Sequence, residues 1–367
     1  MDRTAMMQRV GHLQQWGGTR LVTLEDGSER GVRAVEFRTT AGLEFAVLID
    51  RGMDIGWARY QGRSIAWHSQ TGFVSPAYAE VDAGMGWLKT FSGGLFNSSG
   101  LDHALFPETD PHDTYGEAAR ASGTSYGIHG RVSTIPGRLI AYGEQWRDDV
   151  CYLYAEAEVD QATGLGEHLR LVRRVETTLD GMHVSWTDRV ENVWHLPTPH
   201  MFLYHTNLGA PLLDESCELL IPSVSIRWTT PNVPDNDPEV YRRLVAPQPG
   251  FEAQAFEHEM TADPDGRVEV ALVNRNDESR PWGVVMEYDS ARFPFFFQWR
   301  FLAVGNYLTA FEPSTNSALG RAHAREAGEL TMLESGEWRE ATTTLRILDG
   351  VDACDATAAR IAALLAH

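Results

Sequence analysis

The chain has 367 residues, of which 43% are hydrophobic, and its formal net charge is -20 at pH 7. This is enough apolar material for a sizeable core in one large domain or two ordinary ones. The acidic balance argues against binding to nucleic-acid phosphates or to anionic membrane surfaces, because both need clustered Lys and Arg. A neutral or weakly charged small molecule is the partner that this composition favours.

The first elements along the chain are a helix and then paired strands. Residues 1–16 are predicted to form a short N-terminal helix, because their apolar residues recur near helical spacing. Alternation of apolar and polar residues in 31–50 predicts two strands paired around Ala41-Gly42. Residues 84–130 show little periodicity but contain several large apolar side chains, so we expect ordered loops that pack against the core.

The second half contains the clearest turn and helix signals. Asp180-Gly181 separates two alternating runs in residues 173–192 and predicts a tight hairpin. Asp265-Gly266 precedes another alternating run in the same way. Residues 352–366 predict a C-terminal helix with an apolar stripe and Asp355 as its cap.

Many short strands with turn signals and few helices predict an all-β fold, a large antiparallel β-sandwich. The 33 glycines, 17 prolines and 11 tryptophans agree, since turns and aromatic-rich strands use these residues. No repeat or composition break marks a boundary, so residues 1–367 are expected to form a single domain.

The cysteines and the N-terminus indicate the compartment. Cys151, Cys217 and Cys354 are widely spaced and match no zinc pattern, so we expect neither a disulfide framework nor a structural zinc. The N-terminus has no apolar stretch long enough for a signal peptide, and no run approaches the length of a membrane span. We therefore expect a cytoplasmic protein.

His205 ends an apolar run in "MFLYHTNLGAP" (201–211) and is the first candidate functional group. A lone histidine in this context is ordinarily a core residue whose hydrogen bonds are satisfied. Here Thr206, Asn207 and a turn follow, and strand ends that open into loops are where β-sandwiches place ligand contacts. The ring can donate or accept a proton near neutral pH.

Glu312 ends a second apolar run in "LTAFEPSTN" (308–316) and precedes a proline. The side chain could simply leave the strand into solvent. The preceding "FFFQWRFLAVGNYL" implies heavy burial, and a carboxylate among aromatic rings loses solvation, which raises its pKa and makes it a better base. The residues alone leave these interpretations about even.

Two further segments combine charged groups with glycines. In "YGIHGRV" (126–132), His129 precedes Arg131, and the glycines allow positive φ and close approach of a ligand, or an ordinary turn. In "LIDRGMDIG" (48–56), Arg51 and Asp54 follow an apolar strand. An ion pair that closes a turn is there at least as good an interpretation as sugar binding.

Metal and cofactor motifs are absent from the sequence. His103 and His112 lie among aspartates in residues 100–116, but their spacing matches no ligand pattern, and a polar loop is the better interpretation. There is no GxSxG, no P-loop and no dinucleotide-binding GxGxxG between a strand and a helix. We expect no metal and no cofactor, and we disfavour hydrolases, kinases and dehydrogenases.

Taken in order, "IHGR", "YHTNLG" and "FEPSTN" resemble the galactose mutarotase (aldose 1-epimerase) superfamily. "LIDRGMDIG" and "FSGGLFNSSGLDH" are more similar still to an uncharacterised branch of it, a domain of unknown function. The resemblance extends over residues 30–350 and is specific through the order of its short motifs. It implies a galactose mutarotase-like β-supersandwich with a sugar cleft on its concave face.

The resemblance also implies roles. Glu312 would take the proton from the anomeric hydroxyl, His205 would protonate the ring oxygen, and His129 would hydrogen-bond the sugar. Ring opening, rotation about C1–C2 and reclosure would then interconvert the anomers of an aldose or ketose. The chemistry of the residues agrees, because ring opening needs one proton acceptor and one proton donor. We expect the two side chains not to touch, because the sugar must fit between them.

The motifs depart from the usual family pattern in two places. The segment from His205 to Leu208 is shorter than the usual H-x-Y-F-N-L, and Arg131 follows Gly130 where HGG is usual. The substitutes proposed for the remaining sugar contacts are Arg51, Asp54, Asn97, Arg131, Asn207 and Trp299. The two arginines would favour a substrate with an acid, phosphate or sulfonate group, since guanidinium forks match such oxyanions.

The expected partner is a small sugar or sugar derivative, with neither nucleic acid nor membrane, and a homodimer is compatible with the sequence. Two other functions stay open. A lyase or glycoside-cleaving enzyme could use the same cleft, but glycosidases usually need a second carboxylate, such as Asp54, opposite Glu312. A non-catalytic carbohydrate-binding protein could use the same fold without chemistry.

Overall fold

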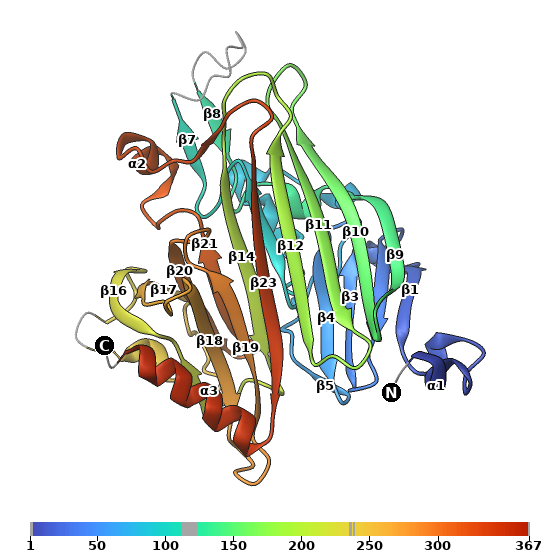
Figure 1. Ribbon diagram of the computed structural model, residues 1–367. Coiled ribbons are helices and arrows are strands. Elements are labelled where there is room, and N and C mark those ends of the chain that lie inside the picture. Colours follow the sequence, from blue (N-terminus) through green and yellow to red (C-terminus); the bar gives the residue numbers. More distant parts are fainter. Residues whose placement is uncertain (1–2, 112–122, 235–236, 238, 366–367) are drawn as a thin grey trace.

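The computed structural model describes residues 3–111, 123–234, 237 and 239–365. Antiparallel strands dominate and helices are few and short, which confirms the predicted all-β sandwich (Figure 1). Over these described residues, no helix is both long enough and apolar enough to cross a membrane.

One layer is an antiparallel sheet of eight strands. In spatial order these are β15 (Cys217–Leu220), β18 (Arg267–Asn274), β19 (Trp282–Asp289), β23 (Trp338–Asp349), β12 (His183–Asn192), β11 (His168–Thr178), β10 (Val150–Ala162) and β9 (Arg138–Arg147). Every second residue of β11 and β12 is buried, because successive side chains of a strand point to opposite faces. These two strands form the hairpin predicted around Asp180-Gly181.

The other layer consists of two sheets. The first contains β1 (Gly18–Thr23), β2 (Arg33–Arg38), β3 (Leu43–Leu48), β4 (Asp54–Tyr60) and β5 (Arg63–Ser64). The second contains β16 (Ser223–Thr229), β17 (Gln254–Met260), β20 (Phe295–Ala303), β21 (Asn306–Ser314), β14 (Met201–Gly209) and β6 (Asn97–Leu101). Figure 1 shows the first of them (blue) behind β9 to β12 (green). A single apolar core takes side chains from all three sheets, for example Phe45, Trp186 and Phe296.

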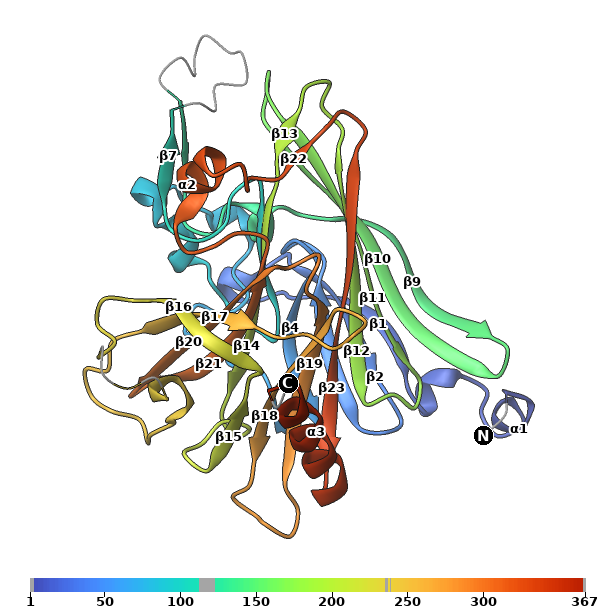
Figure 2. The same ribbon diagram turned by 60° about the vertical axis from the view of Figure 1, so that its left-hand side comes forward.

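Smaller elements surround these layers. Helix α3 (Val351–Leu364) packs through Cys354 and Ile361 on the outer face of the eight-stranded sheet. Near one end of the molecule lie α2 (Gly320–Glu326) and the strand pairs β7 (Glu108–Asp110) with β8 (Thr124–Tyr126) and β13 (Thr198–Pro199) with β22 (Met332–Leu333) (Figure 2). The 3-10 turns are η1 (Leu13–Gln15), η2 (Gly27–Glu29), η3 (Pro76–Tyr78), η4 (Asp82–Gly84), η5 (Gly86–Lys89), η7 (Val132–Thr134) and η8 (Val240–Arg242).

Three predicted elements differ in detail. Residues 1–16 contain α1 (Arg3–Met7) and the turn η1 rather than one helix, and Gly11 between them disfavours a continuous helix. The C-terminal helix starts after Gly350, so Asp355 is not its cap but accepts a hydrogen bond from Arg275 at 2.9 Å. The turn at Asp265-Gly266 closes no hairpin, because the strands on either side of it, β17 and β18, belong to different sheets.

Candidate active site

Strand β14 is buried at all nine positions and divides its side chains between two environments. Phe202 and Tyr204 belong to the core between the layers, whereas Met201 and Leu203 belong to a separate apolar cluster. Because side chains alternate along a strand, His205 shares the face of Leu203. Its ring therefore points to the outer face of the six-stranded sheet and away from the core.

Strand register brings Glu312 next to His205. In the antiparallel pair β14 and β21, Leu203 lies opposite Ser314 and Thr206 opposite Phe311, which sets His205 opposite Glu312. Side chains directly opposite each other in neighbouring strands start about 5 Å apart, and His205 Nε2 lies 3.2 Å from Glu312 Oε1. The expectation that these side chains do not touch is therefore wrong, because the two residues are cross-strand neighbours.

The two residues line a cavity of about 510 Å³ whose wall is mainly aromatic. Its rings come from Trp67, Trp87, Phe91, Phe106, Trp228, Phe297, Trp299 and Phe301. The last three occupy alternate positions of β20 and so cover one face of that strand. Of these eight, only Trp299 is predicted from the sequence, although the alternation of aromatic residues in 297–301 carries the signal for its two neighbours.

His129 enters the same cavity from the loop after β8. A Cβ at the adjacent Gly130 would lie 2.5 Å from the carbonyl oxygens of Gly100 and His103, so this glycine allows the loop to pack closely. The ring centroid of His129 lies 4.5 Å from that of Trp87 and 5.7 Å from that of His205. Gly130 thus serves backbone packing, while the histidine beside it faces the cavity.

Burial sets the protonation of the three titratable groups. It raises the pKa of Glu312 well above its usual value and lowers the pKa of His205 to about 3, because a buried group is disfavoured in its charged form. Burial also lowers the pKa of His129, and the nearby His205 adds to this effect. Burial thus favours the neutral form of each partner of the 3.2 Å contact, although the distance alone would suit an ion pair.

These residues also keep polar atoms without partners. His129 Nδ1 and His205 Nδ1 are buried and have no hydrogen-bond partner among the described residues, and Glu312 Oε1 has only its 3.2 Å contact with His205 Nε2, which does not meet hydrogen-bond geometry. Leaving such an atom unpaired costs about 1–3 kcal/mol, and native structures contain few of them. The described residues contain other such atoms, for example Arg51 Nε and Asn97 Oδ1, but these three belong to residues that line one cavity and so indicate a site whose hydrogen bonds a ligand can complete.

Arg51, Asp54 and Asn97 do not line the cavity, and their positions do not support the predicted sugar contacts. Arg51 is buried and donates to two backbone carbonyl groups at 2.8 and 2.6 Å. Asp54 accepts a hydrogen bond from Asn97 Nδ2 at 3.0 Å and lies 3.3 Å from Arg173. All three are used to hold strands and loops together.

Arg131 and Asn207 are also engaged elsewhere. Arg131 donates to Glu167 at 3.2 Å and to Thr163 at 3.0 Å, beside a separate hollow of about 270 Å³. Asn207 Nδ2 donates to the backbone oxygen of His205 at 3.0 Å. Among the described residues that line the cavity there is no arginine or lysine, so the expected preference for an acidic substrate has no support there.

In the described part of the histidine-rich loop, residues 100–111, the histidine has a structural role. His103 is buried, and its Nε2 lies 2.8 Å from the backbone oxygen of Phe106, which fixes the loop that contributes Phe106 to the cavity. His112 lies outside the described residues. In the part of the chain that the structure describes, no group of three or more potential ligands could hold a metal ion.

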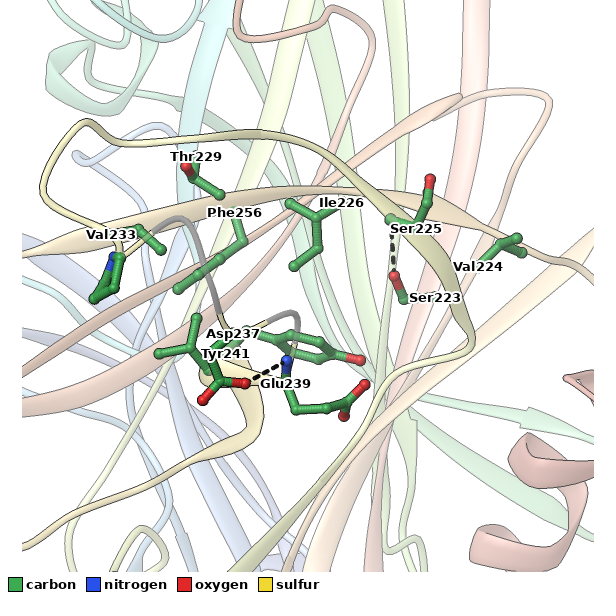
Figure 3. A pocket seen from close by; sticks show the side chains of 12 residues that line it. Ser223, Val224, Ser225, Ile226, Thr229, Val233, Asp237, Glu239, Tyr241 and Phe256 are labelled. Atoms are coloured by element: carbon green, nitrogen blue, oxygen red, sulfur yellow. Dashed lines mark hydrogen bonds between the residues drawn. The ribbon is translucent and has the colours of Figure 1, made fainter.

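A hollow of similar size, about 450 Å³, lies beside β16 and β17 and is shown in Figure 3. Its two carboxylates are already paired, the half-buried Asp237 with Arg243 at 2.5 Å and the exposed Glu239 with Arg242 at 3.2 Å. It contains no buried unpartnered atom among its described residues. The aromatic cavity is therefore the better candidate site.

Comparisons with known proteins agree with the motifs. A family model described as "Domain of unknown function (DUF4432)" matches residues 29–347. No curated protein matches the chain in sequence.

Solved structures of low sequence identity share the fold. An inferred aldose 1-epimerase from Klebsiella pneumoniae superposes with a TM-score of 0.83 at 20% identity, over 98% of this chain and 90% of that one. A galactose mutarotase-like protein from Clostridium acetobutylicum superposes with a TM-score of 0.60 at 14% identity, over 90% of this chain and 98% of that one. Galactose 1-epimerase from Lactobacillus acidophilus superposes with a TM-score of 0.56 at 12% identity, over 91% of this chain and 99% of that one. These similarities confirm a galactose mutarotase-like β-sandwich.

Proposed function

This chain belongs to the DUF4432 family, and from that premise we propose that it is a carbohydrate isomerase, a 1-epimerase that interconverts the anomers of an aldose or ketose. The observation that carries the proposal is the 3.2 Å contact of His205 with Glu312 in a cavity bordered by unpartnered polar atoms. A carboxyl group and an imidazole in a desolvated cleft are the two groups that acid–base ring opening requires.

The proposed reaction uses one transferable proton in the pair. Ring opening starts from the ion-pair form, in which the proton of Glu312 has passed to His205 across their 3.2 Å contact; Glu312 then accepts the proton of the anomeric hydroxyl and His205 donates its proton to the ring oxygen. The pair is then a glutamic acid and a neutral imidazole, the two forms that burial favours in this cavity. After rotation about C1–C2, the ring recloses on the other face and both transfers run in reverse, so the enzyme returns to its initial state.

The other cavity residues would bind and orient the sugar. His129 Nδ1 is buried without a partner and can bond a sugar hydroxyl. The Trp299 ring lies 5.4 Å from the His205 ring and offers a flat apolar face to the C–H groups of the sugar. No nucleophile is needed, because protons are the only groups that the protein exchanges with the substrate.

A glycoside-cleaving enzyme is less well supported. Such enzymes ordinarily place two carboxyl groups on either side of the scissile bond. Among the described lining residues Glu312 is the sole carboxylate, and Asp54 is bound to Asn97 and Arg173 elsewhere. The second carboxylate that this alternative requires is not found at the cavity.

The proposal predicts that Glu312→Gln and His205→Ala each slow anomer exchange by about 10²–10⁴-fold, the usual contribution of a general acid or base. Exchange NMR across a panel of reducing sugars measures the rate, and circular dichroism checks that the fold is kept. Glu259→Gln, an exposed acid paired with Arg227 outside the cavity, should retain the wild-type rate. Unchanged exchange in either active-site variant would rule the mechanism out. Tight sugar binding without exchange above background would instead indicate a carbohydrate-binding protein.

A further inference from the structure

The chemistry of the cavity wall restricts the sugar beyond what its acid–base pair requires. Resting on the proposed function, we propose that the substrate is an uncharged, partly deoxygenated reducing sugar whose apolar face or substituent contacts the aromatic wall. Fully hydroxylated hexoses and anionic sugars would then be poor substrates.

The charge of the lining excludes an anionic group. Among the described lining residues, Glu312 is the sole Asp, Glu, Lys or Arg. Its side chain is acidic, so it cannot balance the negative charge of a ligand. The guanidinium of Arg131, which faces the neighbouring hollow, is paired with Glu167. A carboxylate, phosphate or sulfonate would therefore be desolvated in this cavity without a cation to balance it.

The lining also offers few partners for hydroxyl groups. Besides His129, His205 and Glu312, the polar groups are the side chains of Ser69, Thr230 and Asn306 and the indole N–H donors of the four tryptophans, so apolar ring surface still makes up most of the wall. Two of these oxygens already accept backbone hydrogen bonds, Ser69 Oγ from Thr71 at 3.3 Å and Thr230 Oγ1 from Ala255 at 3.2 Å. A hydroxyl turned toward the eight aromatic rings would lose water without a replacement, whereas a hydrogen or a methyl group at the same carbon would gain apolar contact.

The cavity extends from this wall to an apolar rim. Phe106 and Leu88 line it and remain 50% and 49% exposed, and the Phe106 ring lies 6.0 Å from that of Trp228. The hydrogen bond between the His103 ring and the backbone oxygen of Phe106 holds this side of the rim in place. A volume of about 510 Å³ exceeds what one pyranose ring fills, so an apolar substituent has room between Phe106 and Trp228.

Matched pairs of free sugars test this assignment. The pairs are 6-deoxy-D-glucose with D-glucose, D-fucose with D-galactose and L-rhamnose with L-mannose, together with 6-O-benzyl-D-glucose, glucuronate and glucose 6-phosphate. We expect kcat/KM for anomer exchange to be about tenfold higher for the deoxy member of at least one pair and for the benzyl ether, and lowest for the anions. Equal rates within every pair, or faster turnover of an anion, would overturn the assignment.

A rim variant locates the apolar group. Phe106→Ser should reduce the preference for the benzyl ether over glucose severalfold, whereas Trp338→Ser, an aromatic residue of similar exposure on β23, should leave it unchanged. An unaltered preference in Phe106→Ser would overturn the placement at this rim.

Binding to Glu312→Gln, measured by calorimetry with the same sugars, separates this inference from the proposed function. If the wild type exchanges no sugar but the variant still binds the deoxy sugars more tightly, the isomerase proposal fails and the ligand class stands. If exchange occurs without any such preference, the ligand class fails and the isomerase stands.

Discussion

Two buried polar clusters lie on opposite faces of strand β14 and differ in how well their hydrogen bonds are satisfied. On the core side, Tyr204 donates to Asp188 at 2.7 Å, and Asp188 pairs with Arg173 at 2.6 Å. On the outer side, the next residue, His205, contacts Glu312, while its Nδ1 has no hydrogen-bond partner among the described residues. Successive residues of one strand thus belong to a closed network and to an open one.

The comparison shows that burial by itself does not identify a functional site. Arg173 and Asp188 are at least as buried as His205 and Glu312. In the core, each charge has an opposite charge within hydrogen-bond distance, so the network needs nothing further. At the cavity, burial favours the neutral form of both groups, and His205 Nδ1 has no hydrogen-bond partner among the described residues. We interpret the first cluster as structural and the second as functional.

Arg173→Met gives the largest expected effect on stability. It leaves Asp188 and Asp54 buried without their cation, which should cost about 3–5 kcal/mol in the free energy of unfolding, measured with urea. Arg174→Met on the same strand is the matched control, because its ion pairs with Glu156 and Glu176 are partly exposed and should be worth at most about 1 kcal/mol. Similar losses in both variants would contradict a closed core network.

Tyr204→Phe tests the same network with a smaller change, the loss of one hydroxyl group. It keeps the ring but removes the donor to Asp188, and a hydrogen bond to a charged group contributes about 1.5–3 kcal/mol. Because the hydroxyl points away from the cavity, the rate of anomer exchange per folded molecule should match that of the wild type. A slower rate with unchanged stability would show that the two faces of β14 are not independent.

The sequence predicts the local part of this arrangement. Alternation in residues 173–192 is a property of neighbouring residues, and it correctly predicts the hairpin of β11 and β12. The order of the motifs selects His205 and Glu312, which the structure does bring together. Asp54 is misassigned because a carboxylate in a glycine-rich segment looks the same whether its partner is a sugar or a distant arginine such as Arg173.

Contacts that depend on strand register could not be predicted from single segments. The 3.2 Å contact of His205 with Glu312 follows only once β14 is paired with β21 in one register. The same holds for the aromatic wall, since rings from β16, β20 and the loops after β5 converge only in the folded sheet. Local alternation predicts which face of its strand each side chain occupies. The pairing and order of the strands determine which other side chains lie next to it.

The last expected effect is absent at neutral pH and grows only as the pH falls, because it comes from the titration of His205 in the outer cluster. The pKa of His205 falls to about 3 in the folded protein, against about 6.5 in an unfolded chain. As pH falls through this window, the unfolded state binds the proton first, so stability that is present at neutral pH is lost progressively. His205→Gln removes this loss, and its unfolding free energy should fall less steeply between about pH 6.5 and 3.

Buried His200 and His258 have pKa values lowered to about 4 and about 3 and are present in both the wild type and the variant. Their contributions to the pH dependence of stability therefore cancel when the two proteins are compared. Equal slopes in the wild type and in His205→Gln would mean that His205 is not held neutral by its cavity.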